Sequence, residues 1–403
     1  MTPMRRRDFL ASVAASAACL CAAPRSGIME GLLPTDPDRV LVLLQMSGGN
    51  DGLSMVVPFG MDTYHKVRRA SRIPTESVLK LDALVGLNPS LKALMPIWES
   101  GRLAVIQGAG YPSPNRSHFE SMDIWHAADT RGRDAGEGWV GRWADAVPDD
   151  TFDANTVVHV GGDKPWSLHA RRHAAVAFTR ADLFKWHGTA DEQAAFERVA
   201  ETTGRDGGRD DAIERIRRAI RDAQTSSAAI RDAAAAYKPK AKYGNSALSR
   251  QLATIAALVH GGVRGRVYSV TFGGFDTHTG QRARHDALMA DLGDSLAAFL
   301  SDLREQGHDK RVVVMTFSEF GRRIEENASG GTDHGTAGPM FVVGTPVVGG
   351  LYGTHPSLDD TDRGDLKFNV DFRRVYATLI DRWIGGDARR ILDGEFAPLP
   401  FLA

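Results

Sequence analysis

Short, continuous apolar runs that alternate with helical stretches constrain the fold of this chain more than any other feature. Such runs are typical of strands buried on both faces, as in a parallel sheet. Six of them lie at residues 39–46, 103–108, 156–160, 266–272, 311–317 and 340–344. Helices are expected between them at residues 90–99, 119–128 and 282–306. The alternation predicts an α/β fold, in which helices cover both faces of a mostly parallel sheet.

Residues 189–243 differ from the rest of the chain, because they are rich in Ala, Arg, Asp and Glu. Helices are expected at residues 191–201, 210–224 and 225–237, with a polar, glycine-containing break at 202–208. We interpret this segment as a helical insertion packed on the sheet domain. It is either a solvated arm or a lid over the site.

The first residues have the pattern of an export signal. A basic start is followed by an alanine-rich stretch that is too short for a stable membrane span. The segment Arg6-Arg7-Asp8-Phe9-Leu10 resembles the twin-arginine signature. We therefore expect residues 1–27 to be a signal peptide and 28–403 to be one α/β domain. This predicts a periplasmic or secreted protein, with the twin-arginine translocase as its partner during export.

Composition and charge exclude several kinds of partner and ligand. Lys and Arg number 49 and Asp and Glu 50, so the chain has no general attraction to nucleic acid or anionic lipid. The two cysteines, Cys19 and Cys21, lie within the predicted signal peptide. The mature protein therefore has no thiolate with which to bind a metal.

Polar side chains follow several of the predicted strands, at the edge where ligands gather in open α/β sheets. Asp276 and His278 come just after one strand, and Asp333 and His334 precede another. Carboxylate and imidazole groups without thiolate suit zinc or manganese. The joint placement of these pairs predicts a metal site.

Ser117 has two interpretations. It precedes a predicted helix, where serine is most often an N-cap. Alternatively, Arg116 and the helix start would bind a phosphate or sulfate group, and a nearby metal would activate the Ser117 hydroxyl as a nucleophile. Arg322 is expected either to clamp an oxyanion or to be a solvated helix residue.

These residues together resemble an exported bacterial family, domain of unknown function 1501, which is similar to the alkaline phosphatase and sulfatase superfamily. The matching segments are the twin-arginine start and residues 47–52, 115–119, 273–278, 318–322 and 333–335. The resemblance implies an alkaline-phosphatase-like three-layer sandwich and a divalent metal cofactor of one or two ions. Its expected metal ligands are Asp51, Asp276, His278, Glu319, Asp333 and His334, and its expected substrate-binding residues are Asn50, Asn115, His118 and Arg322.

The resemblance also shows two departures. Pro112 stands where a formylglycine sulfatase has its Cys or Ser nucleophile, which argues against that activity. The superfamily usually has an Asp-His pair at the end of the corresponding strand. Here Glu319 replaces its acid, and no histidine stands beside Glu319 in the sequence. We therefore expect an exported metal-dependent hydrolase that cleaves phosphate esters, or related sulfate esters or diesters. Its catalytic residues are expected to be Ser117 and Arg116. The alternative is a non-catalytic exported module that binds an anionic ligand or glycan on the same fold.

Overall fold

The computed structural model describes residues 36–185, the isolated positions 189, 191, 194 and 198, and residues 211–402, of which 211–223 as backbone only. The predicted signal peptide and most of the segment 189–210 lie outside these ranges. Within them, none of the helices combines the length and the apolar character needed to cross a bilayer.

The central sheet contains all six predicted strands, and these predictions are confirmed. Their bounds are β1 (Val40–Ser47), β5 (Leu103–Gly110), β6 (Val157–Val160), β8 (Val267–Gly273), β9 (Val312–Phe317) and β10 (Gly338–Val343). The sequence analysis missed the short strands β7 (Val176–Phe178), β11 (Gly350–Tyr352) and β14 (Val370–Asp371). The strand order is β11-β5-β10-β9-β1-β8-β6-β7, with β14 beside β5.

Strand direction explains how distant loops come together. Strands β9, β1, β8, β6 and β7 are parallel neighbours, while β10 is antiparallel to both β9 and β5. The predicted mostly parallel sheet is therefore confirmed. Since β5 runs in the same direction as β1, the carboxyl ends of β1, β5, β8 and β9 lie at one edge of the sheet. Strand β10 begins at that same edge.

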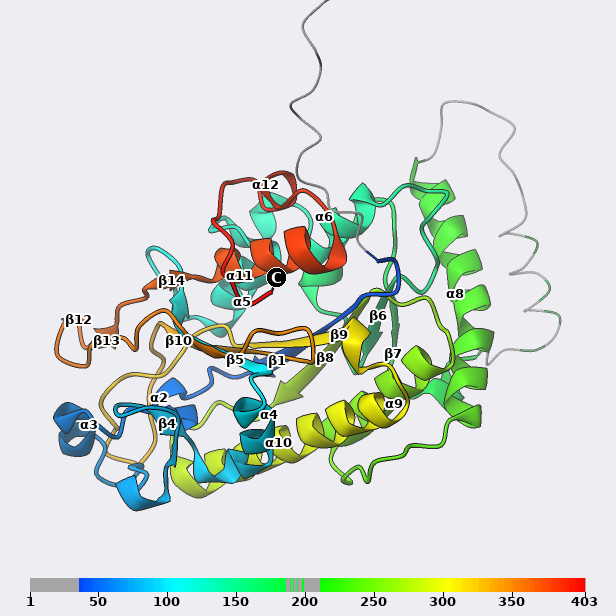
Figure 1. The fold of residues 1–403 in the computed structure, drawn as a ribbon. Helices are drawn as coiled ribbons and strands as arrows, with labels where there is room; N and C mark the ends of the chain where they lie inside the picture. Colours follow the sequence, from blue (N-terminus) through cyan, green and yellow to red (C-terminus); the bar gives the residue numbers. More distant parts are fainter. Residues whose placement is uncertain are drawn as a thin grey trace, which may run out of the picture.

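Helices cover both faces of this sheet (Figure 1), which confirms the predicted three-layer architecture. Helices α9 (Ala247–His260) and α10 (Gln281–Glu305) lie on one face, and α5 (His118–Ala127), α6 (Trp139–Ala146), α11 (Phe372–Leu379) and α12 (Ala388–Ile391) on the other. Smaller elements are α2 (Gly52–Met55), α3 (Asp62–Val67), β2 (Val56–Val57), β3 (Leu79–Lys80), β4 (Gly86–Leu87), β12 (Thr361–Asp362) and β13 (Asp365–Leu366).

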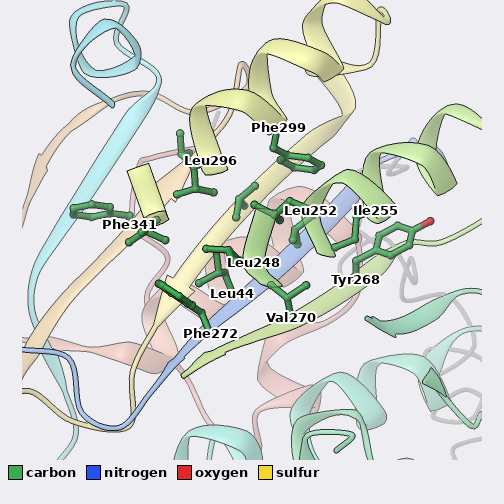
Figure 2. Packing of buried hydrophobic residues seen from close by; sticks show 14 of the residues in the cluster. Leu44, Leu248, Leu252, Ile255, Tyr268, Val270, Phe272, Leu296, Phe299 and Phe341 are labelled. Carbon is green, nitrogen blue, oxygen red and sulfur yellow. The ribbon is translucent and has the colours of Figure 1, made fainter. Parts of the chain in front are cut away.

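Strand β1 shows why the sheet is sandwiched. Successive side chains of a strand point to opposite faces. Accordingly, Val42 and Leu44 pack into the hydrophobic cluster under α9 and α10, whereas Leu41 and Leu43 pack into the cluster on the opposite face. Figure 2 shows the first cluster, in which Leu44 lies among side chains of α9, α10 and the neighbouring strands. Full burial of each such side chain contributes about 1.5–3 kcal/mol to folding.

Two helix predictions need correction. The helices expected at 210–224 and 225–237 are one continuous helix, α8 (Asp211–Ala236), whose Ile230 and Ala233 are buried in the same cluster as the α9 side chains. The helix expected at 90–99 is a 3₁₀ segment, Pro89–Leu94, followed by α4 (Met95–Glu99). Pro96 explains this break, because proline lacks an N–H and is tolerated only in the first turn of a helix.

Candidate metal centre

Side chains from two loops and one helix meet at the carboxyl edge of the sheet. Asp276 and His278 follow β8, and His334 lies in the connection from β9 to β10. His118 is the first residue of α5, which follows β5. The structure thus brings together three residues that the sequence predicted as metal ligands, and adds His118, which was expected to bind substrate.

One carboxylate oxygen lies at the centre of this group. The Nε2 atoms of the three imidazoles lie close to Oδ1 of Asp276, at 3.0 Å for His278, 3.3 Å for His334 and 3.5 Å for His118. The Nε2 atoms of His278 and His334 are themselves 3.0 Å apart. Four potential ligand atoms therefore converge on one small volume.

The other ring nitrogen of each histidine contacts an oxygen that can only accept a hydrogen bond. Nδ1 of His118 lies 2.8 Å from Glu319 Oε1. Nδ1 of His278 lies 3.2 Å from Asp333 Oδ1, and Nδ1 of His334 lies 2.8 Å from the Arg116 carbonyl. Each Nδ1 must therefore donate, which leaves the Nε2 of each neutral ring with a lone pair. A carboxylate or carbonyl behind a histidine is the usual outer support of a metal ligand.

The arrangement fits a divalent ion. Zinc bound at about 2.0–2.1 Å in a tetrahedron requires ligand atoms about 3.3 Å apart, and the distances to Asp276 are 3.0–3.5 Å. The Nε2 atom of His118 is buried and has no hydrogen-bond partner. Such an atom is costly in a folded protein unless another group satisfies it. Three imidazole nitrogens with one carboxylate oxygen are a donor set that zinc accepts.

The electrostatics of the cluster set its protonation. Partial burial raises the pKa of Asp276, but the hydrogen bond and charge of Arg322 outweigh this effect and lower that pKa to about 2. Burial lowers the pKa of His334. The hydrogen bond to Glu319 raises the pKa of His118. At neutral pH, Asp276 is thus ionised and His334 is neutral, which are the forms that bind metals.

Asp51 does not join the cluster, in contrast to the expectation that it ligates a metal. Its side chain is completely buried and forms an ion pair with Arg68, in which Nη1 lies 2.6 Å from Oδ2 and Nη2 lies 3.0 Å from Oδ1. Gln281 and Ser54 also donate to Oδ2. The Asp51 carboxylate therefore neutralises the buried Arg68 inside the fold and does not face the open site.

Glu319 and Asp333, which were predicted as direct ligands, contact the cluster through its histidines. Each lies behind a histidine and accepts its Nδ1 hydrogen, so each orients an imidazole. Glu319 Oε1 additionally accepts from the backbone N–H of Gly48 at 2.8 Å. No histidine is adjacent to Glu319 in the sequence, but the ring of His118 lies beside it in space.

Arg322 and Asn50 have no open face from which to bind substrate, contrary to expectation. The Arg322 side chain is fully buried, and its guanidinium donates to backbone carbonyls and to Asp276. Asn50 is buried too, with its amide oxygen 3.0 Å from Nε2 of His285. Both side chains stabilise the loops that carry the cluster.

The loop before α5 places Ser117 next to the cluster. Its neighbour Arg116 contacts His334 through its carbonyl, and its other neighbour is His118. Ser117 holds the N-cap position of α5, but its hydroxyl makes no capping hydrogen bond. The backbone N–H of Ser117 instead donates to Asn115 Oδ1 at 2.7 Å. Asn115 therefore shapes this turn, while the Ser117 hydroxyl stays uncommitted to the helix.

The sequence analysis missed Arg68 and Gln281, which hold Asp51. Arg68 lies in a basic segment next to Arg69, and nothing in that segment distinguishes a buried arginine from a solvated one. Gln281 begins α10, where glutamine is unremarkable. Only the fold, which brings positions 17 and 230 residues away to Asp51, identifies them.

Comparisons with solved structures find distant similarity in fold. The structure of Ps i-CgsB is 10% identical, with a TM-score of 0.39, and the match covers 89% of this chain and 72% of that one. The structure of BT1596, a 2-O GAG sulfatase, is 8% identical, with a TM-score of 0.32 and coverage of 77% and 65%. Alkaline phosphatase from the Antarctic bacterium TAB5 is 10% identical, with a TM-score of 0.27 and coverage of 78% and 94%.

Comparisons of the sequence are more decisive. No curated protein matches the chain. A family model matches residues 98–394, a span that includes the loops carrying His118, Asp276, His278 and His334. The chain therefore belongs to the family described as "Protein of unknown function (DUF1501)".

Proposed function

We propose that this protein is an exported hydrolase that binds a divalent metal at the cluster. Its substrates would be phosphate esters, or related sulfate esters or phosphodiesters. His118, Asp276, His278 and His334 would hold the ion, and zinc or manganese suits these ligands. The observation that carries the proposal is the convergence of three imidazole Nε2 atoms on Asp276 Oδ1. The three rings are fixed from behind by Glu319, Asp333 and the Arg116 carbonyl.

A bound divalent ion would neutralise negative charge on the ester and favour ionisation of a nearby hydroxyl. The residues of this chain supply the rest of the chemistry. Ser117 lies between Arg116 and His118, and its hydroxyl is free of the helix cap. Ser117 Oγ would attack the phosphorus or sulfur atom as the bond to the alcohol breaks. The hydroxyl proton would leave to solvent, and water would then hydrolyse the seryl ester.

A cavity of about 600 Å³ next to the cluster supports an anionic substrate. It shares Arg116 and Phe320 with the surroundings of the cluster, because the Phe320 ring packs against the rings of His118 and His334. Arg363 and Lys367 also line it, together with one acid, Asp362. The side chain of Arg116 is 41% exposed and its Nη2 pairs with Asp365, so its remaining N–H groups would be the donors to an ester oxygen.

The proposal includes export by the twin-arginine route to the periplasm or the exterior. It rests on Arg6-Arg7-Asp8-Phe9-Leu10 and the alanine-rich stretch that follows. Residues 28–403 would form one α/β domain, with 189–243 as its helical insertion. A soluble anionic ester or a glycan ester would be the substrate.

Metal analysis and an ester screen test the proposal together. The exported protein is loaded with Zn²⁺ or Mn²⁺, freed of unbound ion, and assayed with 4-nitrophenyl phosphate, bis(4-nitrophenyl) phosphate and 4-nitrophenyl sulfate. We expect bound metal and hydrolysis of at least one ester. His334→Ala should lose both, whereas His260→Ala, an exposed histidine at the end of α9, should keep both.

The outcomes separate the two candidate functions. Absence of bound metal in the native protein would contradict the metal site and the hydrolase together. Bound metal without turnover of any ester, including sulfated and phosphorylated oligosaccharides, would favour the non-catalytic binding module.

A further inference from the structure

Two arginines of the described residues are completely buried, and one of them, Arg322, contacts the candidate metal centre. Arg68 and Arg322 are among the largest fully buried side chains of the described residues. A buried guanidinium is costly unless it is paired and fully hydrogen-bonded. Each of the two pairs with a carboxylate that the family resemblance assigns to metal binding, namely Asp51 and Asp276.

The Asp51 carboxylate is engaged inside the protein by four hydrogen bonds. It accepts two hydrogen bonds from Arg68, one from Ser54 and one from Gln281. Three of these hydrogen bonds end on Oδ2, and the second hydrogen bond from Arg68 ends on Oδ1, so donors engage both oxygens. Its side chain has no exposed surface. A second ion bound to Asp51 would have to displace a buried salt bridge.

Glu319, the other acid expected beside a second ion, is committed as well. Its Oε1 accepts from the Gly48 N–H and from His118 Nδ1, each at 2.8 Å. Its Oε2 accepts from the Ser318 hydroxyl at 3.0 Å. The side chain is only 2% exposed. The acids expected to hold a second ion are thus both engaged inside the protein.

Arg322 is held by backbone groups in contact with the cluster. Its Nε donates to the Gly49 carbonyl at 2.6 Å, and Nη2 donates to the Gly48 carbonyl. Gly48 and Gly49 have φ values of +118° and +73°, which favour glycine. A Cβ on Gly48 would lie 2.5 Å from the backbone nitrogen of Asp276. The loop after β1 is therefore built to hold this guanidinium.

The guanidinium directly adjoins the metal ligands. Nη2 of Arg322 lies 2.7 Å from Asp276 Oδ1, and Nη1 lies 3.5 Å from His278 Nε2. Asp276 Oδ1 thus contacts the imidazole nitrogens and a fixed positive charge at once. In two-metal sites the second ion lies about 3.5–4 Å from the first. The position of Arg322 therefore gives the cluster a nearby cation without a second ion.

We propose that this centre holds one divalent ion, that the buried guanidinium of Arg322 supplies beside it the positive charge that a second ion would otherwise bring, and that Arg68 occupies the carboxylate of Asp51. The inference rests on the metal site of the proposed function. It limits the chemistry, because only one ion is available to contact the ester, and the fixed cations have no open face toward it.

Metal stoichiometry tests this inference without relying on activity. The exported protein is loaded with excess Zn²⁺ or Mn²⁺, desalted, and measured by inductively coupled plasma mass spectrometry against protein concentration. We expect about one ion per chain, close to none in His334→Ala, and about one in the matched control His260→Ala.

Each outcome has a defined meaning. Two ions in the native protein, both lost in His334→Ala, would overturn the single-ion inference and leave the proposed metal site intact. Two ions of which one persists in His334→Ala would overturn the inference as well, because a second ion held by Asp51 and Glu319 does not depend on His334. No bound ion in the native protein would overturn the metal site itself, and the inference with it.

Discussion

Replacing Asp51 by Asn separates a structural carboxylate from a metal ligand. Burial raises the pKa of Asp51, but the charge and hydrogen bonds of Arg68, together with smaller contributions from His285 and Ser54, outweigh it and lower this pKa from 3.8 to about 2. Because one pKa unit is worth about 1.4 kcal/mol, the lowering contributes about 2 kcal/mol to folding stability at neutral pH. Removing one partner of a buried ion pair costs about 3–5 kcal/mol, because the other charge remains unpaired.

Urea unfolding at pH 7, followed by tryptophan fluorescence, measures this cost. Asp51→Asn and Arg68→Met should each lower the free energy of unfolding by about 3 kcal/mol or more. The double variant should lose less than the sum, with a coupling energy of about 2 kcal/mol, because neither charge is then left unpaired. The metal content of Asp51→Asn should stay at that of the native protein.

The pH dependence has a defined sign. The folded pKa of Asp51 is below its unfolded value, so its contribution is full above about pH 4 and is lost as the pH falls toward 2. Asp51→Asn should remove that part of the acid dependence. If Asp51→Asn unfolds at the native urea concentration but has lost its ion, Asp51 is a ligand and the reasoning fails.

Further predictions concern the site and export. Ser117→Ala should reduce ester turnover on the order of 10⁴-fold with metal content unchanged; a capping serine would instead show nearly full activity and a loss of about 0.5–2 kcal/mol in urea unfolding. Glu319→Gln should weaken metal affinity about 10–100-fold in chelator competition. Metal retention should fall as the pH is lowered, starting above the usual imidazole pKa of about 6.5, since the pKa of His118 is raised and its ring must lose a proton to bind. Arg6→Lys combined with Arg7→Lys should leave precursor in the cytoplasm by fractionation.

The sheet was predictable because burial on both faces leaves a clear pattern. The run at residues 39–46 is continuous and apolar, and β1 (Val40–Ser47) lies at the middle of the sheet with helices on both sides. Short strands such as β11 and β14 carry no such pattern, because they pair at one edge over two or three residues. The antiparallel direction of β10 depends on how the loop after β9 returns to the sheet. The hydrophobic pattern of a strand does not indicate its direction.

The convergence of Asp276, His278 and His334 followed from topology, because the loops at one sheet edge must meet. Direct and supporting positions could not be separated in the same way. His118 was placed with the substrate-binding residues and Glu319 with the ligands, whereas the structure places the His118 ring at the cluster and Glu319 behind it. That distinction depends on side-chain direction over a few ångströms, and strand order alone does not determine it.

Asp51 and Asp276 show that an arginine partner does not by itself decide what a carboxylate does. Both follow a central strand, and both meet a buried arginine. Arg68 binds both oxygens of Asp51, whose side chain has no exposed surface. Arg322 donates most of its N–H groups to backbone carbonyls and contacts only Oδ1 of Asp276. The Asp276 side chain remains 49% exposed. The number of donors already bound to a carboxylate, rather than its place in a motif, therefore determines whether it is available to a metal ion.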